Sequence, residues 1–427
     1  MLGSASYLSL SLVCTFGTPV ADMLAHSPPL PLVIDYFFEG CSITAEDEEG
    51  IQLALQRGRV RRIRLRMPAP NPNMQKFIKA IDGEYPLLEY LILVYPTEGQ
   101  STALMLPETL QAPHLRHLAL DGITLPIGSQ LLTTAVGIVT LLLFMEYPST
   151  YFQPNTLLQL ILFMPKLETL VIDLSLSEPN TDVETQLVQT PTGTDVTVTL
   201  PNLRWFWFGG VSTYLEEVVS RITTPRLERL DVQFLEQLIF PVPCLLQFID
   251  TAKNLRFDSV KFELYECISV EIYLHGAKTH ALAITLNCWP IHWQVSCVAQ
   301  IFNSLGQISS TVEHLTFECR LYPTRYSYSS EEYNDRPEWR KLLRSFSNAK
   351  TLFVDDRLLE KLSCCLRLED EELPLELLPK LQELTYSGRG NTGDAFTQFI
   401  DARKNAGCPV TLTCRTQESV VPSTNGY

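Results

Sequence analysis

One short phrase recurs along this chain and limits its possible folds more than any other feature of the sequence. The phrase reads Pro, any residue, Leu, a charged or polar residue, any residue, and then an apolar-x-apolar triplet. Six full copies begin at Pro86, Pro113, Pro165, Pro201, Pro225 and Pro379. A phrase that returns at a regular interval indicates a repeat architecture, in which each copy buries its apolar face by stacking on the next copy.

Degenerate copies lie before and between the full ones. If the Leu two positions after the Pro is taken as the anchor, the degenerate copies are anchored at Val60, Val139, Leu255, Ala281, Val312 and Ala349. The twelve anchors span 321 residues, from Val60 to Leu381, so neighbouring anchors lie about 29 residues apart. This interval is typical of leucine-rich repeats, at the long end of their range.

The repeat predicts the local structure of each copy. The apolar-x-apolar triplet predicts a short strand with two side chains in the core and the middle one outward. The long interval leaves room for a returning helix, and Trp339, Leu342, Leu343 and Phe346 follow helical spacing. We therefore expect an α/β fold of the leucine-rich-repeat solenoid type: an irregular horseshoe with a parallel sheet on the concave face and helices on the convex face.

The repeat also predicts the organisation of the chain. Residues 1–50 are assigned to an N-terminal cap, residues 51–410 to a solenoid of about 12 repeats, and residues 411–427 to a C-terminal tail. Two overlong intervals, at about 177–199 and 321–337, are predicted to be surface loops.

Charge and cysteine usage narrow the class of protein. The net charge of −15 argues against a general nucleic-acid or membrane-surface binder, because both ligands attract positive surface. The longest apolar runs reach about half of the roughly 20 residues that a membrane span needs. The eleven cysteines are scattered and form no C-x-x-C pair, which favours a reducing compartment, cytoplasmic or nuclear.

The motifs of common enzymes and cofactor sites are absent or weak. The chain has no G-x-x-x-x-G-K-[ST] phosphate loop, and the G-x-G-x-x-G spacing at Gly388, Gly390 and Gly393 lacks the strand–helix context of a dinucleotide site. The histidines have no partners at metal-ligand spacing, and Cys408 and Cys414 are expected to be two reduced thiols. We therefore expect no catalytic residue, no cofactor and no metal.

The outward residues of the strands are the expected binding surface. Trp205 and Trp207 share this face by period-two alternation, while Phe206 and Phe208 point into the core. The other candidate partner-binding residues are Arg62, Arg64, Arg66, Tyr90, His117, Arg229 and Asp231, and the alternation also places Leu141 and Leu143 outward.

Two of these features have alternative interpretations. The tryptophans can belong to an irregular core that the following loop covers. The arginines at 62, 64 and 66 can bind carboxylates or a phosphorylated peptide, or they can keep the open edge of a first strand soluble.

The repeat phrases, the run from Ala25 to Tyr36 and the closing phrase from Leu381 to Gly388 resemble the large fungal family of F-box-type leucine-rich-repeat proteins. The resemblance covers about residues 2–410. It implies a substrate-recognition subunit of a cullin ubiquitin ligase, in which an F-box docks onto the ligase adaptor. The stretch from Leu2 to Ser11 resembles the segment directly after the F-box in such proteins, without its usual Trp, so we expect the adaptor as a partner only if a longer product carries an F-box.

These observations favour a non-catalytic scaffold that binds a protein on the concave face. The alternative is a repeat-type regulator of a GTPase, which completes its partner's active site with an exposed arginine, or another free-standing interaction protein.

Overall fold

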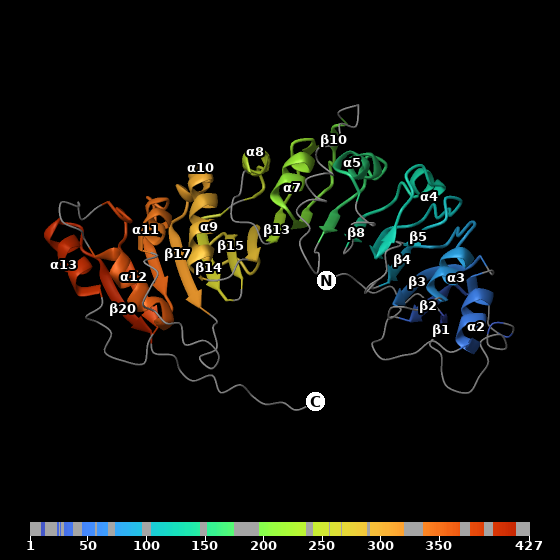
Figure 1. Ribbon diagram of the computed structural model, residues 1–427, viewed down its shortest axis with the longest axis horizontal. Helices are drawn as coiled ribbons and strands as arrows, with labels where there is room; N and C mark the ends of the chain where they lie inside the picture. The colour runs from blue at the N-terminus through green and yellow to red at the C-terminus, as the bar shows by residue number, and fades with distance from the viewer. Residues whose placement is uncertain are drawn as a thin grey trace. The chain divides into compact units, whose positions relative to one another are not determined.

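The computed structural model describes residues 10–12, 24, 26, 30–36, 45–55, 58–66, 73–95, 104–145, 152–174, 196–235, 242–255, 257–265, 267–287, 291–319, 336–367, 376–387 and 396–415. The chain divides into two compact units, Met1–Glu228 and Arg229–Tyr427, and Figure 1 shows their helices and strands. It is a mixed α/β protein whose strands are mostly parallel.

Unit 1 is built on a parallel sheet. Its strand order is β1-β2-β3-β4-β6-β8-β9-β11, and neighbouring strands pair in parallel. The strands are β1 (Leu10–Leu12), β2 (Leu32–Tyr36), β3 (Val60–Arg66), β4 (Tyr90–Val94), β6 (His117–Asp121), β8 (Thr140–Phe144), β9 (Thr169–Asp173) and β11 (Trp205–Gly210). Two short parallel pairs accompany the sheet: β5 (Leu104–Met105) with β7 (Ile123–Thr124), and β10 (Val198–Thr199) with β12 (Ile222–Thr223).

Helices connect these strands and bury one side of the sheet. They are α2 (Ala45–Leu55), α3 (Asn73–Ala80), α4 (Gln130–Thr134), α5 (Pro154–Leu162) and α7 (Ser212–Val219). Helix α5 begins with Pro154, whose fixed φ and missing N–H suit the first helical turn. Its residues Leu157, Leu158 and Ile161 are buried.

A tight turn recurs along unit 1, in each case just before a strand, and gives the repeated phrase its structural basis. The anchor N–H donates to the carbonyl three residues earlier at 3.0–3.3 Å, and every anchor side chain is fully buried. These anchors are Leu88, Leu115, Ile138, Leu167, Leu203 and Leu227. The Pro two residues before the anchor is exposed in each full copy of this set. Because the Pro lies at the surface, its lack of an N–H donor removes no buried hydrogen bond.

The anchor predicted at Val139 is wrong by one residue. The turn bond is made by Ile138, and β8 pairs with β6 so that Thr140 lies opposite His117. Because side chains alternate along a strand, this shift moves each one to the other face. Leu141 and Leu143 are therefore buried in the core, and Leu142 takes the outward position.

Unit 2 contains a sheet of mixed direction. Its strand order is β13-β16-β15-β14-β17-β18-β19-β20. The strands are β13 (Arg229–Leu235), β14 (Ser259–Leu264), β15 (Ile268–Tyr273), β16 (Leu282–Asn287), β17 (His314–Cys319), β18 (Thr351–Val354), β19 (Glu383–Ser387) and β20 (Thr411–Arg415). Strand β20 extends the sheet into the segment that we assigned to the C-terminal tail.

The expectation of an all-parallel sheet is wrong at β15, which runs antiparallel to both β14 and β16. Only Tyr265, Glu266 and Cys267 separate β14 from β15, and a parallel crossover needs a dozen or more residues. The chain therefore turns back, and β16 pairs with β13. The copy anchored at Ala281 precedes the copy anchored at Leu255 in the sheet, and the Ala281 N–H donates to Ile272 of β15 instead of closing a turn.

The helices of unit 2 are α8 (Pro243–Thr251), α9 (Ile291–Ser304), α10 (Gly306–Ser309), α11 (Arg336–Arg344), α12 (Leu359–Leu366) and α13 (Thr397–Asn405), with a 3-10 turn η2 (Asp356–Leu358). The helical stripe predicted around Trp339 is confirmed for Trp339, Leu342 and Leu343, which α11 buries, whereas the buried Phe346 lies two residues beyond the end of this helix. Trp339 packs edge-on against Phe317 of β17, and Phe346 packs against Phe262 of β14. These aromatic contacts join the helices to the sheet.

The two predicted surface loops lie almost wholly outside the described residues. Only their last residues, 196–199 and 336–337, belong to the described chain. The glycine motif at Gly388, Gly390 and Gly393 also lies outside it.

Candidate functional site

The strand register of unit 1 aligns its outward side chains into rows on the sheet face opposite the helices, which we call the open face. The first row is Arg62, Tyr90, His117, Thr140, Thr169 and Trp205. The second row is Arg64, Ile92, Ala119, Leu142, Val171 and Trp207, and the third is Arg66, Val94, Asp121, Phe144, Asp173 and Gly209. Seven of the nine predicted binding residues, Trp207 included, therefore lie on this face.

Three predicted residues of the first row stack on one another. The Arg62 guanidinium carbon lies 4.4 Å from the centre of the Tyr90 ring. The Tyr90 ring is parallel to the His117 ring, with 4.3 Å between their centres and 8° between their planes. The stack runs across β3, β4 and β6, so its side chains hold one another in place.

The electrostatics of the stack keep His117 neutral. Burial is the largest effect that lowers the pKa of His117 below its ordinary value of 6.5, and the charges of Arg116 and Arg62 lower it further. Glu89 acts in the opposite direction. At neutral pH the charge of the stack is therefore that of Arg62.

The second row is apolar from Ile92 to Trp207. Ile92, Leu142 and Trp207 are half-buried, while Ala119 and Val171 are buried at 7% exposure each. Apolar side chains on the outer face of a sheet are candidates for contact with another molecule. The hydrophobic part of the open face therefore runs across strands β4, β6, β8, β9 and β11.

A glycine makes room for the Trp207 ring. A Cβ atom placed on Gly209 would lie 2.6 Å from the far edge of the Trp207 indole and 2.8 Å from Asp173 Oδ1. Both distances are well inside van der Waals contact. The indole ring thus lies along the strand over Gly209. A larger residue at position 209 would displace the ring.

The predicted alternation in β11 is confirmed. Phe206 and Phe208 are fully buried, and Trp205 and Trp207 are half-buried on the open face. Part of each indole is therefore accessible.

The interpretation of the arginine row as protection of an open edge strand is wrong. Strand β3 is internal, with β2 on one side and β4 on the other. The row is also not three equivalent guanidinium groups. Arg64 Nη1 lies 3.0 Å from Asp35 Oδ2 of β2, whereas Arg62 stacks on Tyr90, and Arg66 ends the strand in an exposed position.

Sequence reasoning missed Asp35 and Glu89 as partners of this strand. Arg61 occupies a bulge, since Leu32 pairs with Val60 and Val33 with Arg62, and its guanidinium lies 2.9 Å from Glu89. Alternation in the sequence could not reveal the bulge. The acidic residue directly after the Leu88 anchor was the available signal for the Arg61 partner.

Arg229 and Asp231 belong to unit 2, where they form a separate cluster with His280. Arg229 Nε lies 2.7 Å from Asp231 Oδ2, and His280 Nε2 lies 2.6 Å from Asp231 Oδ1. The other ring nitrogen of His280 is 4.0 Å from Glu271. A carboxylate–histidine pair serves catalysis when its second nitrogen reaches a nucleophile, and here it faces another carboxylate. The cluster therefore links β13 to the residues before β16.

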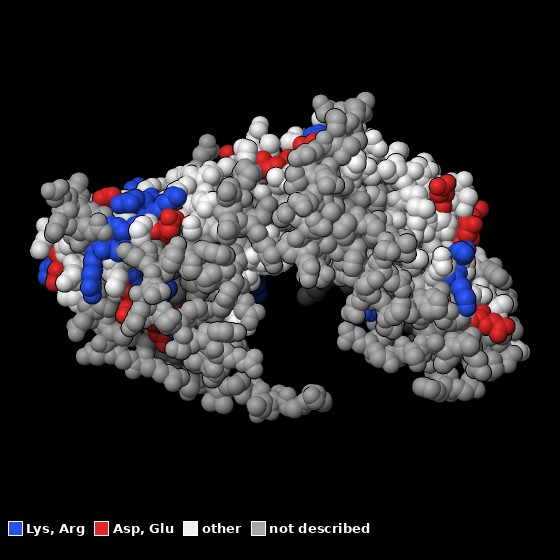
Figure 2. All heavy atoms as spheres, viewed as in Figure 1, with Lys and Arg blue, Asp and Glu red and all other residues white. Residues whose placement is uncertain are grey.

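Basic side chains gather over α11 in Figure 2, and three arginines of this helix have structural partners. Arg340 donates to the carbonyls of Cys365 and Arg367 at 2.7 and 3.0 Å, and Arg336 donates to Arg367 at 2.9 Å. Arg344 pairs with Glu376. The first two arginines cap the carboxyl end of α12, where carbonyls lack helical partners.

Other site types receive no support from the described part of the chain. Its residues include no group of three His, Cys, Asp or Glu side chains arranged for a metal ion. Its eight cysteines, Cys408 and Cys414 among them, form no disulfide with one another. No helix within the described ranges has both the length and the apolar character that crossing a membrane requires.

The open face of unit 1 is thus the best-supported candidate site. Comparisons of the chain with protein-family models, with curated proteins and with solved structures found no match.

Proposed function

We propose that this protein is a non-catalytic binding scaffold of the leucine-rich-repeat type, which holds a partner protein on the open face of unit 1. The observation that carries the proposal is the alignment of Arg62, Tyr90 and His117 in one row with Trp205, beside the apolar row that ends at Trp207. Aromatic and arginine side chains dominate the binding energy of protein interfaces.

The regular turns support the repeat part of the proposal. In unit 1, six anchors make the same backbone hydrogen bond at their turns. Strands of the main sheet that are consecutive along the chain also pair with each other in the sheet. A solenoid of stacked repeats predicts this order, with its binding surface on the strand face. In unit 2 the β14–β15–β16 segment is an antiparallel excursion within the repeated pattern.

Function in a cullin ubiquitin ligase is the more specific form of this proposal. It rests on the resemblance of the repeat phrases to F-box-type leucine-rich-repeat proteins. Such a receptor would bind its substrate on the strand face, while the ligase adaptor would bind an F-box in a longer product. Cytoplasmic or nuclear localisation follows from the same proposal.

A comparison of variants tests the scaffold function. The full-length wild-type chain and a Trp205→Ala/Trp207→Ala variant would each be immobilised and exposed to extract from cells that express the protein. A Phe163→Ser variant is the matched control, because Phe163 is 40% exposed at the end of α5 and lies outside the three rows. Bound proteins would be quantified by mass spectrometry.

We expect at least one protein that the wild-type and Phe163→Ser chains retain and the double variant loses. If the double variant retains every protein, with an unchanged circular dichroism spectrum, the open face is not the binding site. Native capture with an antibody tests the ligase role separately. Recovery of the cullin adaptor on a larger product would support that role, and a 48.3 kDa product without the adaptor would favour a free-standing scaffold.

A further inference from the structure

Among the residues that the structure describes, Arg62 has no acidic partner, unlike the neighbouring Arg61 and Arg64. Arg61 pairs with Glu89 at 2.9 Å, and Arg64 pairs with Asp35 at 3.0 Å. Within the part of the chain that the structure describes, the Arg62 guanidinium instead makes a cation–π contact with the face of the Tyr90 ring. The N–H donors of Arg62 are therefore available to a ligand, whereas Arg61 and Arg64 are already paired with carboxylates.

The stack prepares Arg62 to receive an anion. A flat guanidinium held on an aromatic ring keeps its N–H fork in a fixed plane, so it loses less side-chain freedom on binding. His117 supports the opposite face of the Tyr90 ring without adding a positive charge at neutral pH. The single guanidinium of this stack matches the single charge of a carboxylate, which it can bind with two parallel hydrogen bonds. A phosphate dianion calls for a cluster of uncompensated arginines.

The second row provides the apolar part of the same surface. From Arg62 on β3 to the tryptophans on β11, the register crosses five strand-to-strand steps. At roughly 4.8 Å per step, this distance is about 24 Å. An extended peptide advances roughly 3.3 Å per residue, so about seven residues cover it.

The width of the two rows favours an extended ligand. Residues two apart in a strand are separated by about 7 Å, which is the spacing between the first and second rows. A helix is about 10–12 Å wide with its side chains, so it would also cover the third row, where Asp121 and Asp173 would lie close to an acidic segment. A single extended chain above the two rows can reach Arg62 with one side chain and the apolar row with others.

We propose that the open face of unit 1 binds an extended segment of a partner protein that crosses the strands. An Asp or Glu of the segment binds Arg62, and an apolar side chain about seven residues away packs on Trp207. This inference rests on the proposed function, and it adds the chemistry and the spacing of the bound segment.

Selection from a phage-displayed library of random 12-residue peptides tests the inference. The full-length wild-type chain would be the target, and the peptides selected most often would be synthesised with a fluorescent label. We expect the enriched sequences to pair an acidic residue with an apolar or aromatic residue about seven positions away. Enriched sequences without an acidic residue, or without this spacing, would overturn the inference.

Anisotropy titrations of a selected peptide against three variants then locate the contacts. A hydrogen-bonded charge contributes about 1.5–3 kcal/mol, so Arg62→Gln should weaken binding at least about tenfold. Trp207→Ala should weaken it by a similar factor. Arg226→Gln is the matched control: this arginine is exposed in the turn after β12, lies outside the three rows and donates a hydrogen bond to Asn202, and its removal should change the affinity less than about twofold.

The outcomes separate the two proposals. If Trp207→Ala weakens binding and Arg62→Gln does not, the scaffold function survives and the acidic contact is refuted. If no peptide is selected, the inference of a linear segment is refuted, and the scaffold function is judged by the capture experiment alone. Circular dichroism melting curves of the variants show whether a loss of binding reflects a loss of fold.

Discussion

Gly209 and Gly210 are adjacent at the end of β11 and lie next to different parts of unit 1. A substitution at Gly209 alters the open face, and a substitution at Gly210 alters the core. A Cβ on Gly209 would meet the side-chain ends of Trp207 and Asp173 on the open face. A Cβ on Gly210 would meet Phe208 at 2.9 Å and the Cβ of Leu174 at 3.2 Å, and both of these residues are fully buried. We predict opposite effects for Gly209→Ala and Gly210→Ala.

The expected magnitudes follow from the atoms that must move. In Gly209→Ala the indole edge must retreat by about 1 Å to reach a normal carbon–carbon separation. Side-chain ends can do so at a cost of about 1 kcal/mol, which the restricted unfolded chain offsets by about 0.4–1 kcal/mol. In Gly210→Ala the Leu174 Cβ is fixed to the backbone and Phe208 is enclosed, so we expect a loss of about 2 kcal/mol.

Two measurements check this pair. Urea unfolding followed by circular dichroism should leave the midpoint of Gly209→Ala near that of the wild type and lower that of Gly210→Ala. Capture of the partner, measured well below the melting temperature, should fall for Gly209→Ala and persist for Gly210→Ala. If Gly209→Ala retains full capture, the position of the Trp207 ring does not matter for binding and our account of the open face fails.

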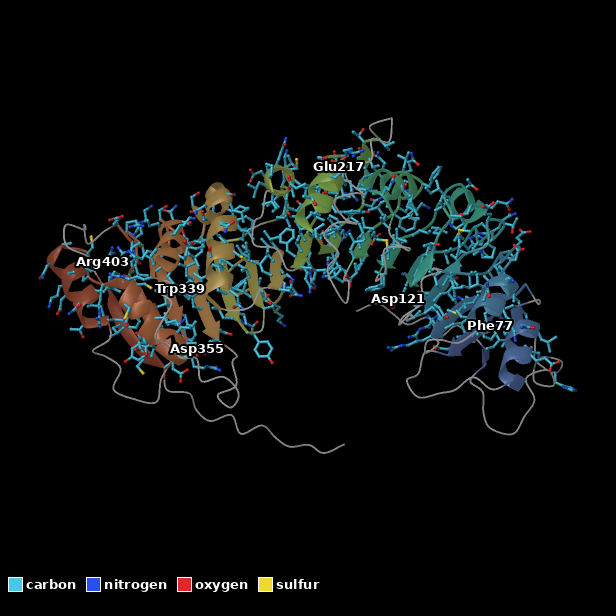
Figure 3. All side chains as sticks on the ribbon, in the orientation of Figure 1. Phe77, Asp121, Glu217, Trp339, Asp355 and Arg403 are labelled. Atoms are coloured by element: carbon cyan, nitrogen blue, oxygen red, sulfur yellow. The ribbon has the colours of Figure 1, made fainter. Side chains whose placement is uncertain are left out.

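Two further predictions concern stability. Arg403, labelled on α13 in Figure 3, is 1% exposed. It donates to the carbonyls of Leu378, Pro379 and Leu381 at 3.3, 3.0 and 3.0 Å, so Arg403→Met should lower the free energy of unfolding in urea by about 3 kcal/mol. Lys404→Met, at the exposed neighbouring position, should change it by less than about 0.5 kcal/mol. Equal effects of the two changes would refute this role. The lowered pKa of His117 means that the unfolded chain binds the proton more readily, so its contribution to the unfolding free energy falls as the pH drops below the ordinary 6.5 towards the folded pKa. Between about pH 7.5 and about pH 5.5, the urea midpoint should therefore fall less for His117→Gln than for the wild type, and an identical fall would contradict the proposed environment of the imidazole.

The sequence alone predicted the local structure of the repeat. A buried Leu, a preceding Pro and an apolar-x-apolar triplet determine a turn and a strand through interactions within about ten residues, so the six full copies could be read directly. The same alternation placed Trp205 and Trp207 opposite Phe206 and Phe208, because side-chain direction in a strand depends only on neighbouring residues. The helical stripe around Trp339 was predictable for the corresponding reason.

The tertiary structure decided what depends on pairing between distant segments. The anchor at Ile138 could not be distinguished from Val139, since both are β-branched and apolar, until β8 paired with β6. Whether β3 is an edge strand depended on β2, and the order β13-β16-β15-β14 depended on a connection too short for a crossover. The stack of Arg62, Tyr90 and His117 likewise exists only through the register of three strands separated by 27–28 residues, which fixes which outward side chains become neighbours.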